Sequence, residues 1–443
     1  MRFHHFAAAA CGGWLCGGVA VAQQDGSTTP GSFDRALDQA LADSQKGSAA
    51  SQMNLFGGQL RLLDLSLDAL VNAGTSTEQD ESIEQLQGGG HDPKQRGFTL
   101  SQLELSALGA IDPWFQFESH LVYLLSPEGE SEFELEEVFA RSSALPYGLQ
   151  LKVGQYMTEF GRINSQHPHA WDFIDQPVIH SRVFGPDGMR APGARLSWLA
   201  PLPWFAELYL GLQNSRGETM ASFRGSDEEE APGGRVAVER TTRSLADFAW
   251  SSRLLQSFDL SDETVSLFGL SGAWGPSGGG ASTQSALYGA DLKVKWQRKQ
   301  NEAGWPFVIF QGEAIRRIYG TELQQFDPDG TPSTGDEFAL PGDTLHDTGF
   351  YSYVLWGFRR DWAAGLRWEL ARASGAGVEA RADDALRDDR QRFSPMVVWH
   401  PSHFSRVRLQ YNLDFADHLA HDRAHSVWLG FEFVLGNHPA HTY

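Results

Sequence analysis

Residues 286–296 read ALYGADLKVKW, and apolar and polar side chains alternate along most of this stretch. Leu292 and Trp296 fall on one face, whereas Asp291, Lys293 and Lys295 fall on the other. A period of two places successive side chains on opposite faces of a β-strand. The stretch therefore predicts a strand with one apolar face and one charged face.

The same alternation recurs along the chain from residue 59 onward, for example in RVRLQYNL at 406–413. Segments of about 10 residues are long enough for a tilted strand to cross a membrane. Aromatic residues gather near the segment ends, which is typical of the interfacial girdle of a membrane barrel. The predicted strands are 59–71, 97–109, 113–125, 131–142, 148–157, 192–200, 204–214, 242–252, 263–274, 284–297, 305–319, 348–360, 363–373, 391–399, 403–414 and 424–435.

The links between these segments alternate in length. Links after even-numbered segments are mostly short turns, whereas most links after odd-numbered segments are long and polar. Outer-membrane barrels have tight periplasmic turns and long outer loops. A soluble sandwich also alternates along its strands, but it gives no reason for this asymmetry. We predict an all-β fold, a transmembrane antiparallel β-barrel of about 16 strands, with 14 or 18 as alternatives because segments eight and nine are the least regular.

The N-terminus predicts export. Residues 1–22 combine a basic start, an apolar stretch and Ala20-Val21-Ala22, which is the pattern of a cleaved signal peptide. Residues 23–58 are expected to form a periplasmic N-terminal segment with a short helix at 32–45, and residues 59–443 the barrel in the cell outer membrane. Both cysteines lie within 1–22, so a thiolate metal site or a thiol nucleophile is excluded from the mature chain.

The charge of the chain limits its partners. The formal net charge is −21, which argues against nucleic acid. The expected partners are outer-membrane lipid, lipopolysaccharide and a small solute or ion. Many of the acidic residues lie in the links, where they either bind divalent cations among lipopolysaccharide head groups or are simply solvated.

The link at 158–191 is unusually polar and irregular for its place between two regular strands. In sixteen-stranded porins a long outer loop folds back into the lumen and narrows it, and by analogy we expect this link to do so. The alternative is an ordinary surface loop that caps the barrel. The candidate constriction residues are Glu159, Arg162, His167, His169, Asp172, Asp175, His180 and Arg182.

Residues 149–162 read LQLKVGQYMTEFGR, and PGARLSW follows the link at 192–198. With the surrounding 95–215 they resemble the phosphate-selective porin O and P family. Its strand before the constricting loop is matched by Gly154, Gln155, Tyr156, Phe160 and Gly161. The resemblance implies a sixteen-stranded outer-membrane barrel, often a homotrimer, that passes small solutes.

The lumen faces do not by themselves indicate phosphate. An oxyanion pore needs a file of arginine and lysine donors, whereas the predicted lumen carries both signs and fits cations or zwitterions equally well. The candidate lumen residues are Lys152, Arg195, Lys293, Lys295, Glu313, Arg317, Arg367, Glu369, Arg406 and Arg408.

Two H-P-x-H units suggest a metal site. His400 and His403 precede the predicted fifteenth strand, and His438 and His441 follow the sixteenth, so adjacent strands would bring them together at the periplasmic mouth. Four imidazoles suffice to bind a divalent metal. No other cofactor is expected, and histidines tolerated in loops are the simpler explanation.

The leading hypothesis is a porin for passive diffusion of small hydrophilic solutes or ions. The first alternative is a zinc-like metal-ion uptake channel that uses the histidine clusters. An outer-membrane barrel enzyme or adhesin is the alternative of another class. The chain has no G-x-S-x-G elbow or H-E-x-x-H helix, so we do not expect an enzyme.

Overall fold

The computed structural model describes residues 52–55, 58–61, 63–127, 129–143, 145–226, 230–326, 338–375 and 387–436. The predicted signal peptide, the helix at 32–45 and most of the N-terminal segment lie outside the described residues. His438 and His441 also lie outside them.

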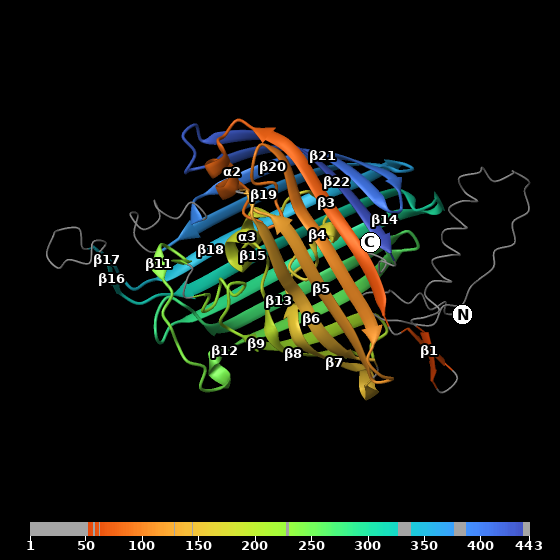
Figure 1. The fold of residues 1–443 in the computed structure, drawn as a ribbon, viewed down its shortest axis with the longest axis horizontal. Helices are drawn as coiled ribbons and strands as arrows, with labels where there is room; N and C mark the ends of the chain where they lie inside the picture. The colour runs from red at the N-terminus through yellow and green to blue at the C-terminus, as the bar shows by residue number, and fades with distance from the viewer. Residues whose placement is uncertain are drawn as a thin grey trace, which may run out of the picture.

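Sixteen antiparallel strands form a closed barrel, which confirms the predicted fold and strand number. Each strand pairs with the next, and the last pairs with the first along Leu429↔Ala73, so the barrel has no free edge (Figure 1). The barrel strands are β3 (Asp64–Ser76), β4 (Gly97–Ala110), β5 (Phe115–Leu125), β6 (Ser131–Ser142), β7 (Leu149–Met157), β8 (Arg190–Leu199), β9 (Phe205–Asn214), β12 (Phe248–Ser261), β13 (Thr264–Pro276), β14 (Gln284–Glu302), β15 (Trp305–Gly320), β18 (Thr344–Arg359), β19 (Trp362–Ser374), β20 (Arg390–Ser402), β21 (Ser405–Ala416) and β22 (Arg423–Gly436).

The two ends of the barrel differ as the link lengths predict. Tight turns join the strands at the end where β3 begins and β22 ends, which makes that end periplasmic. Longer links lie at the outer end, and several of them carry short elements of their own. These elements are α2 (Asp80–Leu86), η3 (Pro168–Ala170), α3 (Val178–Phe184), β10 (Glu230–Ala231), β11 (Arg235–Val236), η4 (Leu245–Asp247), β16 (Gln324–Phe326) and β17 (Phe338–Leu340). At the other end, η2 (Pro146–Gly148) lies in a periplasmic turn. A hairpin of β1 (Gln52–Leu55) and β2 (Gly58–Arg61) precedes the barrel.

Two predicted strands are misplaced. The sequence predicts the first at 59–71, but 58–61 pairs within the N-terminal hairpin and β3 continues to Ser76. The sequence predicts the eighth at 242–252, but β12 begins at Phe248 and continues to Ser261. Leu255 explains this error, because it is apolar yet lies on the buried inner face, and it breaks the alternation after Leu254.

The outer surface of the barrel is apolar along the middle of the strands. Leu270, Leu366, Val397 and Leu429 are all more than two-fifths exposed on that surface, whereas their sequence neighbours turn inward. A closed barrel with such a band belongs in the outer membrane, because lipid satisfies its apolar side chains and the ladder satisfies its backbone. Among the described residues, no helix is both long and apolar enough to cross a membrane.

We predict that Leu270→Arg destabilises the barrel by about 2–4 kcal/mol, because its position near the middle of β13 would place a charge deep in lipid. Leu260→Arg is the matched control, since Leu260 lies exposed at the periplasmic end of β12 and should cost about 0–1 kcal/mol. Urea unfolding in lipid vesicles measures both free energies, and equal costs would contradict this orientation in the membrane.

Candidate functional site

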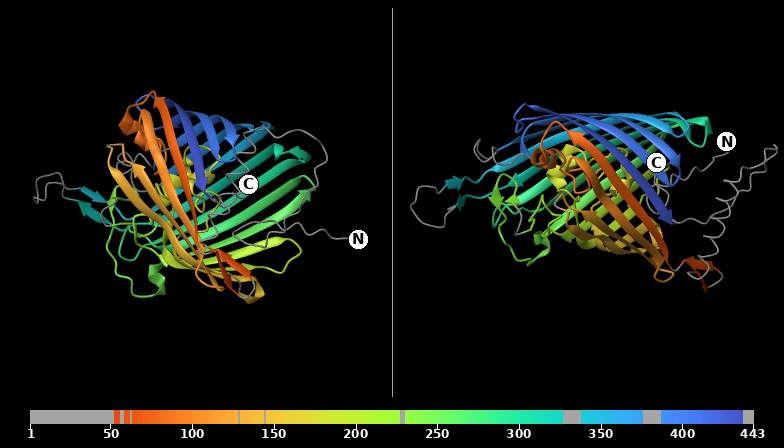
Figure 2. Two further views of the ribbon diagram at one scale, coloured as in Figure 1. Left: turned by 45° about the vertical axis from the view of Figure 1, so that its right-hand side comes forward. Right: turned by 45° about the horizontal axis from the view of Figure 1, so that its top comes forward.

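The link between β7 and β8 lies inside the barrel, and we call residues 158–189 the inserted segment. Figure 2 shows α3 and the coil around it surrounded by strands in both views. Its side chains are largely buried, including His180, Arg182 and Phe184. The predicted link at 158–191 therefore agrees closely with its observed place between β7 and β8.

Asn164 ties the two ends of the inserted segment together. The backbone N–H of Thr158 donates to the carbonyl of Met189 at 2.8 Å, which continues the pairing of β7 with β8. The Asn164 amide donates to the carbonyls of both residues at 2.8 and 3.1 Å, and its own oxygen accepts from the Met189 N–H at 2.7 Å. One buried side chain thus holds the two ends of the inserted segment together.

Gly161 allows the backbone to pass directly against the barrel wall. Its φ is +61°, and a Cβ there would lie 1.5 Å from Glu313 Oε1. Its N–H donates to Ser271 Oγ at 3.1 Å, and the next N–H, of Arg162, donates to Glu313 Oε2 at 3.2 Å. Only glycine meets both the left-handed conformation and the close approach.

Asp175 is the most heavily bonded group of the inserted segment. Its carboxylate accepts from Arg367, from Arg392 Nη1 at 3.0 Å, from Gln410 Nε2 at 2.7 Å and from Asn412 Nδ2 at 2.6 Å. Burial acts to raise the pKa of the carboxyl, but the two guanidinium groups and the hydrogen bonds hold the pKa well below its usual range.

Several arginines on β19–β21, which we call the arginine wall, also hold the backbone of the inserted segment. Arg408 donates to the carbonyls of Trp171 and Phe173 at 3.1 and 2.9 Å. Arg406 donates to the carbonyls of Trp171 and His169 at 3.0 and 2.8 Å. The arginine wall consists of Arg367, Arg392, Arg406 and Arg408.

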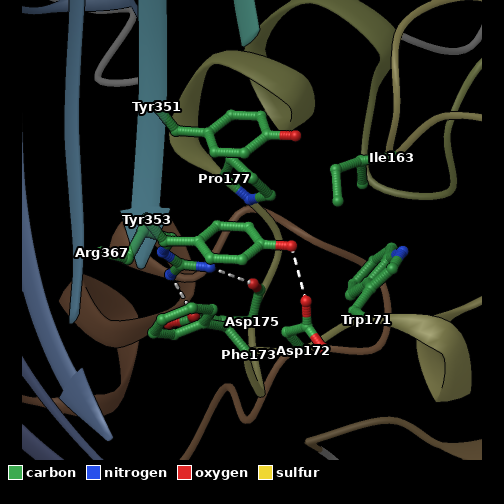
Figure 3. Close-up of a pocket in the computed structure, with 9 residues that line it drawn as sticks. All are labelled: Ile163, Trp171, Asp172, Phe173, Asp175, Pro177, Tyr351, Tyr353 and Arg367. Carbon is green, nitrogen blue, oxygen red and sulfur yellow. Dashed lines mark hydrogen bonds and ion pairs between the residues drawn. The ribbon is translucent and has the colours of Figure 1, made fainter. Parts of the chain in front are cut away.

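Figure 3 shows the face of the inserted segment beside β18 and β19. The Tyr353 hydroxyl donates to Asp172 at 2.6 Å, and the Arg367 guanidinium lies 4.7 Å from the centre of the Phe173 ring. The cavity between these side chains has a volume of about 10 Å³, roughly the room of one water molecule. The inserted segment therefore packs closely here.

Apolar packing fixes the rest of the inserted segment. Ile179, Val183 and Phe184 of α3 share a buried cluster with Met220 and Phe223 of the next outer link. Fully burying each such side chain contributes about 1.5–3 kcal/mol relative to exposure. The helix is thus held by wall and link together.

On β4–β6 the inserted segment meets carboxylates, and we call Glu104, Glu118, Glu136 and Glu137 the acidic wall. His167 Nδ1 lies 2.7 Å from Glu136 Oε2, and its Nε2 lies 3.0 Å from Glu137 Oε2. His169 Nδ1 lies 3.0 Å from Glu104 Oε2. Burial would lower the pKa of the His167 imidazole, but the carboxylates of Glu104 and Glu136 raise that pKa well above its usual value.

Three further candidate residues of the inserted segment also bond to groups outside it. Glu159 pairs with Arg195 at 2.7 Å and with Lys152 at 3.4 Å. His180 Nε2 lies 3.0 Å from Glu313 Oε2, and Arg182 donates to the carbonyl of Asp388 at 2.6 Å.

The candidate lumen residues all lie on the inward face of the barrel by strand register. They include Arg317, which pairs with Asp347 at 2.8 Å. The full set is Lys152, Arg195, Lys293, Lys295, Glu313, Arg317, Arg367, Glu369, Arg406 and Arg408.

The predicted rim site is described only in part. His400 lies in β20 with its ring centre 5.9 Å from that of Trp305, and His403 is exposed in the turn that follows. His400 thus extends the strand rather than forming the turn. Its two expected partners lie outside the described residues, so the rim site stays a prediction.

Three residues of the acidic region were missed by sequence reasoning, namely His91, His120 and Glu137. His120 continues the inward face of β5 from Glu118, and this period-two spacing was the available signal. Glu137 faces inward together with Glu136 because a bulge interrupts the pairing of β5 with β6. Nothing in the sequence places His91, which belongs to a different outer link.

The comparisons with known proteins agree with the barrel. No family model matches the chain. It is 29% identical over 420 residues, covering 89% of this chain and 82% of the relative, to an "Uncharacterized protein" of Aquifex aeolicus (strain VF5). Among solved structures it is similar to the outer membrane channel DcaP of Acinetobacter baumannii, with a TM-score of 0.54, 10% identity and coverage of 87% of this chain and 100% of that one. The chain therefore has the porin fold.

A second neighbour with the porin fold is OprB of Pseudomonas putida. Its TM-score is 0.50 at 11% identity, covering 84% of this chain and 94% of that one. At such low identity the likeness concerns the fold. The finer resemblance to phosphate-selective porins is not confirmed by these matches.

We predict that Gly161→Ala displaces the inserted segment, because the new Cβ would collide with Glu313 and the residue would sit at a strained φ. The strain alone should cost about 1–2 kcal/mol. Gly225→Ala is the matched control, since its φ is +60° with nothing within 4 Å of the added Cβ. Hydrogen exchange of residues 158–189 should accelerate at least tenfold in Gly161→Ala only, and equal effects in both variants would refute the role of close approach.

Proposed function

We propose that this chain is an outer-membrane channel of the porin type, through which small hydrophilic solutes or ions diffuse passively past the inserted segment. The observation that carries the proposal is that one outer link enters the lumen and is held there by charged wall residues on several strands. A segment that only capped the barrel would have no use for these inward-facing partners.

The inserted segment separates two electrostatic environments within the lumen. Carboxylates and imidazoles line β4–β6, whereas guanidinium groups line β19–β21. A solute that passes between them meets opposite charges on its two sides, which favours small polar or zwitterionic molecules over large single-sign ions. This supports the mixed selectivity expected from the sequence.

Phosphate selectivity has weaker support. A pore for oxyanions needs guanidinium or ammonium groups that an anion can reach. Here the arginine wall donates to Asp175, to Glu432 and to backbone carbonyls of the inserted segment. Membership of the phosphate-selective family therefore remains a prediction, as does a homotrimer in contact with lipopolysaccharide.

A closed barrel with a structural or adhesive role is the second candidate. The tight packing around Trp171, Phe173 and Tyr353, with a cavity of about 10 Å³, favours it. With such close packing, passive diffusion through the barrel requires the inserted segment to move so that part of the lumen is open to solute. The enzyme alternative gains no support, because His169 faces Glu104 whereas Asp172 bonds Tyr353.

We predict that Asp175→Asn raises single-channel conductance at least twofold. The change keeps the shape but removes one of the two carboxylate partners of Arg367 and of Arg392, which keep Glu369 and Asp414 respectively. Breaking a buried pair typically costs about 3–5 kcal/mol, and the remaining carboxylates should reduce this cost. The inserted segment should then leave the arginine wall for part of the time. Planar-bilayer recording of the purified, folded protein measures the step size.

Asp417→Asn is the control, because it makes the same charge change in an exposed outer link. Its conductance should equal that of the unaltered protein. Absence of any steps from well-folded protein and from Asp175→Asn would reject the porin and favour the closed barrel. Equal step sizes in all three proteins would show that the inserted segment does not set the pore.

A further inference from the structure

We propose that the lumen holds a site for a divalent first-row transition-metal ion, formed by Glu104 and His120 of the wall and His167 of the inserted segment. This site differs from the rim histidines in both position and residues. Metal binding does not require conduction, so it can succeed or fail independently of the proposed channel.

The geometry of these three side chains fits one ion. Each offers one ligand atom, and these atoms all lie within 4.8 Å of one another. Glu104 Oε1 lies 2.7 Å from His120 Nδ1, and Glu104 Oε2 lies 3.7 Å from His167 Nδ1. Ligand atoms of a tetrahedral zinc ion with bonds of 2.0–2.1 Å lie about 3.3 Å apart. Small side-chain shifts therefore suffice to enclose an ion.

The hydrogen-bonding chemistry of the cluster calls for a cation. Carboxylates only accept, and a neutral imidazole donates from one nitrogen alone. Yet both ring nitrogens of His120 face carboxylates, those of Glu104 and Glu118, at 2.7 and 3.2 Å. Both nitrogens of His167 do the same toward Glu136 and Glu137. A protonated imidazole or a metal ion between imidazole and carboxylate meets this demand. The metal ion would also hold together the three ligand atoms, which already lie within 4.8 Å of one another.

The burial of the carboxylates in this cluster strengthens the need for a positive charge. Glu104 is fully buried, and in the described part of the chain its contacts are all with amide, hydroxyl and imidazole groups. Asp68 is 2% exposed, and neither of its carboxylate oxygens has a hydrogen-bond partner among the described residues. It lies close enough to His169 and Glu104 to add its negative charge to the site. A carboxylate without hydrogen-bond partners is costly at such depth.

A neighbouring group is a poorer candidate. The ligand atoms of His91, Glu134 and Glu136 also lie close together. However, the Arg190 guanidinium pairs with Glu134 and lies 3.7 Å from Glu136 Oε1. That group already has a fixed positive charge, which would repel a second cation. The metal is therefore expected beside His120 and His167.

The donor set indicates the class of metal. Imidazole with carboxylate suits zinc, nickel, cobalt and iron, whereas magnesium and calcium prefer oxygen ligands alone. Ser106 and Gln102 bond Glu104 at 2.7 Å each and would orient it as outer-shell partners. Because His167 belongs to the inserted segment and Glu104 to the wall, a bound ion would fasten one to the other.

The test is a calorimetric titration of chelator-treated, folded full-length protein with zinc chloride at pH 7. We expect one ion per chain with micromolar or tighter affinity. His167→Ala should weaken it at least tenfold, and Glu104→Gln is a second variant should the first fail to fold. His403→Ala is the matched control, since that histidine is exposed at the periplasmic rim, and it should stay within twofold of the unaltered protein.

Cobalt absorption on the unaltered protein gives an independent readout. An intense visible band would report a four- or five-coordinate ion and support the site. Binding no tighter than millimolar, an affinity in both His167→Ala and Glu104→Gln equal to that of the unaltered protein, or loss of binding in His403→Ala alone would each overturn the proposal. The last result would instead place the metal at the rim.

Discussion

The buried carboxylate of Asp175 is the contact on which the arrangement of the lumen depends. It accepts hydrogen bonds from side chains of three neighbouring strands, β19, β20 and β21. Without it, two guanidinium groups in a water-poor interior would each lose one of their two carboxylate partners, with Glu369 left to Arg367 and Asp414 left to Arg392. The same carboxylate fixes Arg367 against Phe173, so that the inserted segment and the arginine wall hold each other in place.

The barrel makes this contact possible because its closure supplies an enclosed polar surface. In lipid the strands must satisfy every backbone group by pairing, which leaves the inward side chains available for other partners. The inserted segment uses them with its backbone as well as its side chains. The N–H of Val178 donates to Glu369 and that of Ile174 to Gln410, at 2.6 and 2.9 Å. The first N–H of α3 and the irregular chain before it thus find hydrogen-bond partners on the barrel wall at membrane depth.

Sequence alone predicted the barrel well because period and link length are local signals. It placed Lys293 and Lys295 on the inward face and located the segment that enters the lumen. It failed at Leu255, where an inward position is apolar, and at Glu137, which a bulge turns inward together with its neighbour Glu136. It could not join His120 to His167, because that contact depends on where an irregular segment crosses the lumen. Long-range placement of this kind has no periodic signature.

The two walls hold the inserted segment by different chemistry. On β19–β21 the donors are guanidinium groups, which stay charged at all ordinary pH values and bond to Asp175 and to carbonyls. On β4–β6 both imidazole nitrogens of His167 face carboxylates, and both contacts are attractive only when the imidazole carries two protons or a metal ion lies between the groups. The arginine wall is therefore a constant anchor, whereas the acidic wall is conditional. Any opening that responds to pH or metal should begin at His167, with Asp175 as the fixed point about which the segment moves.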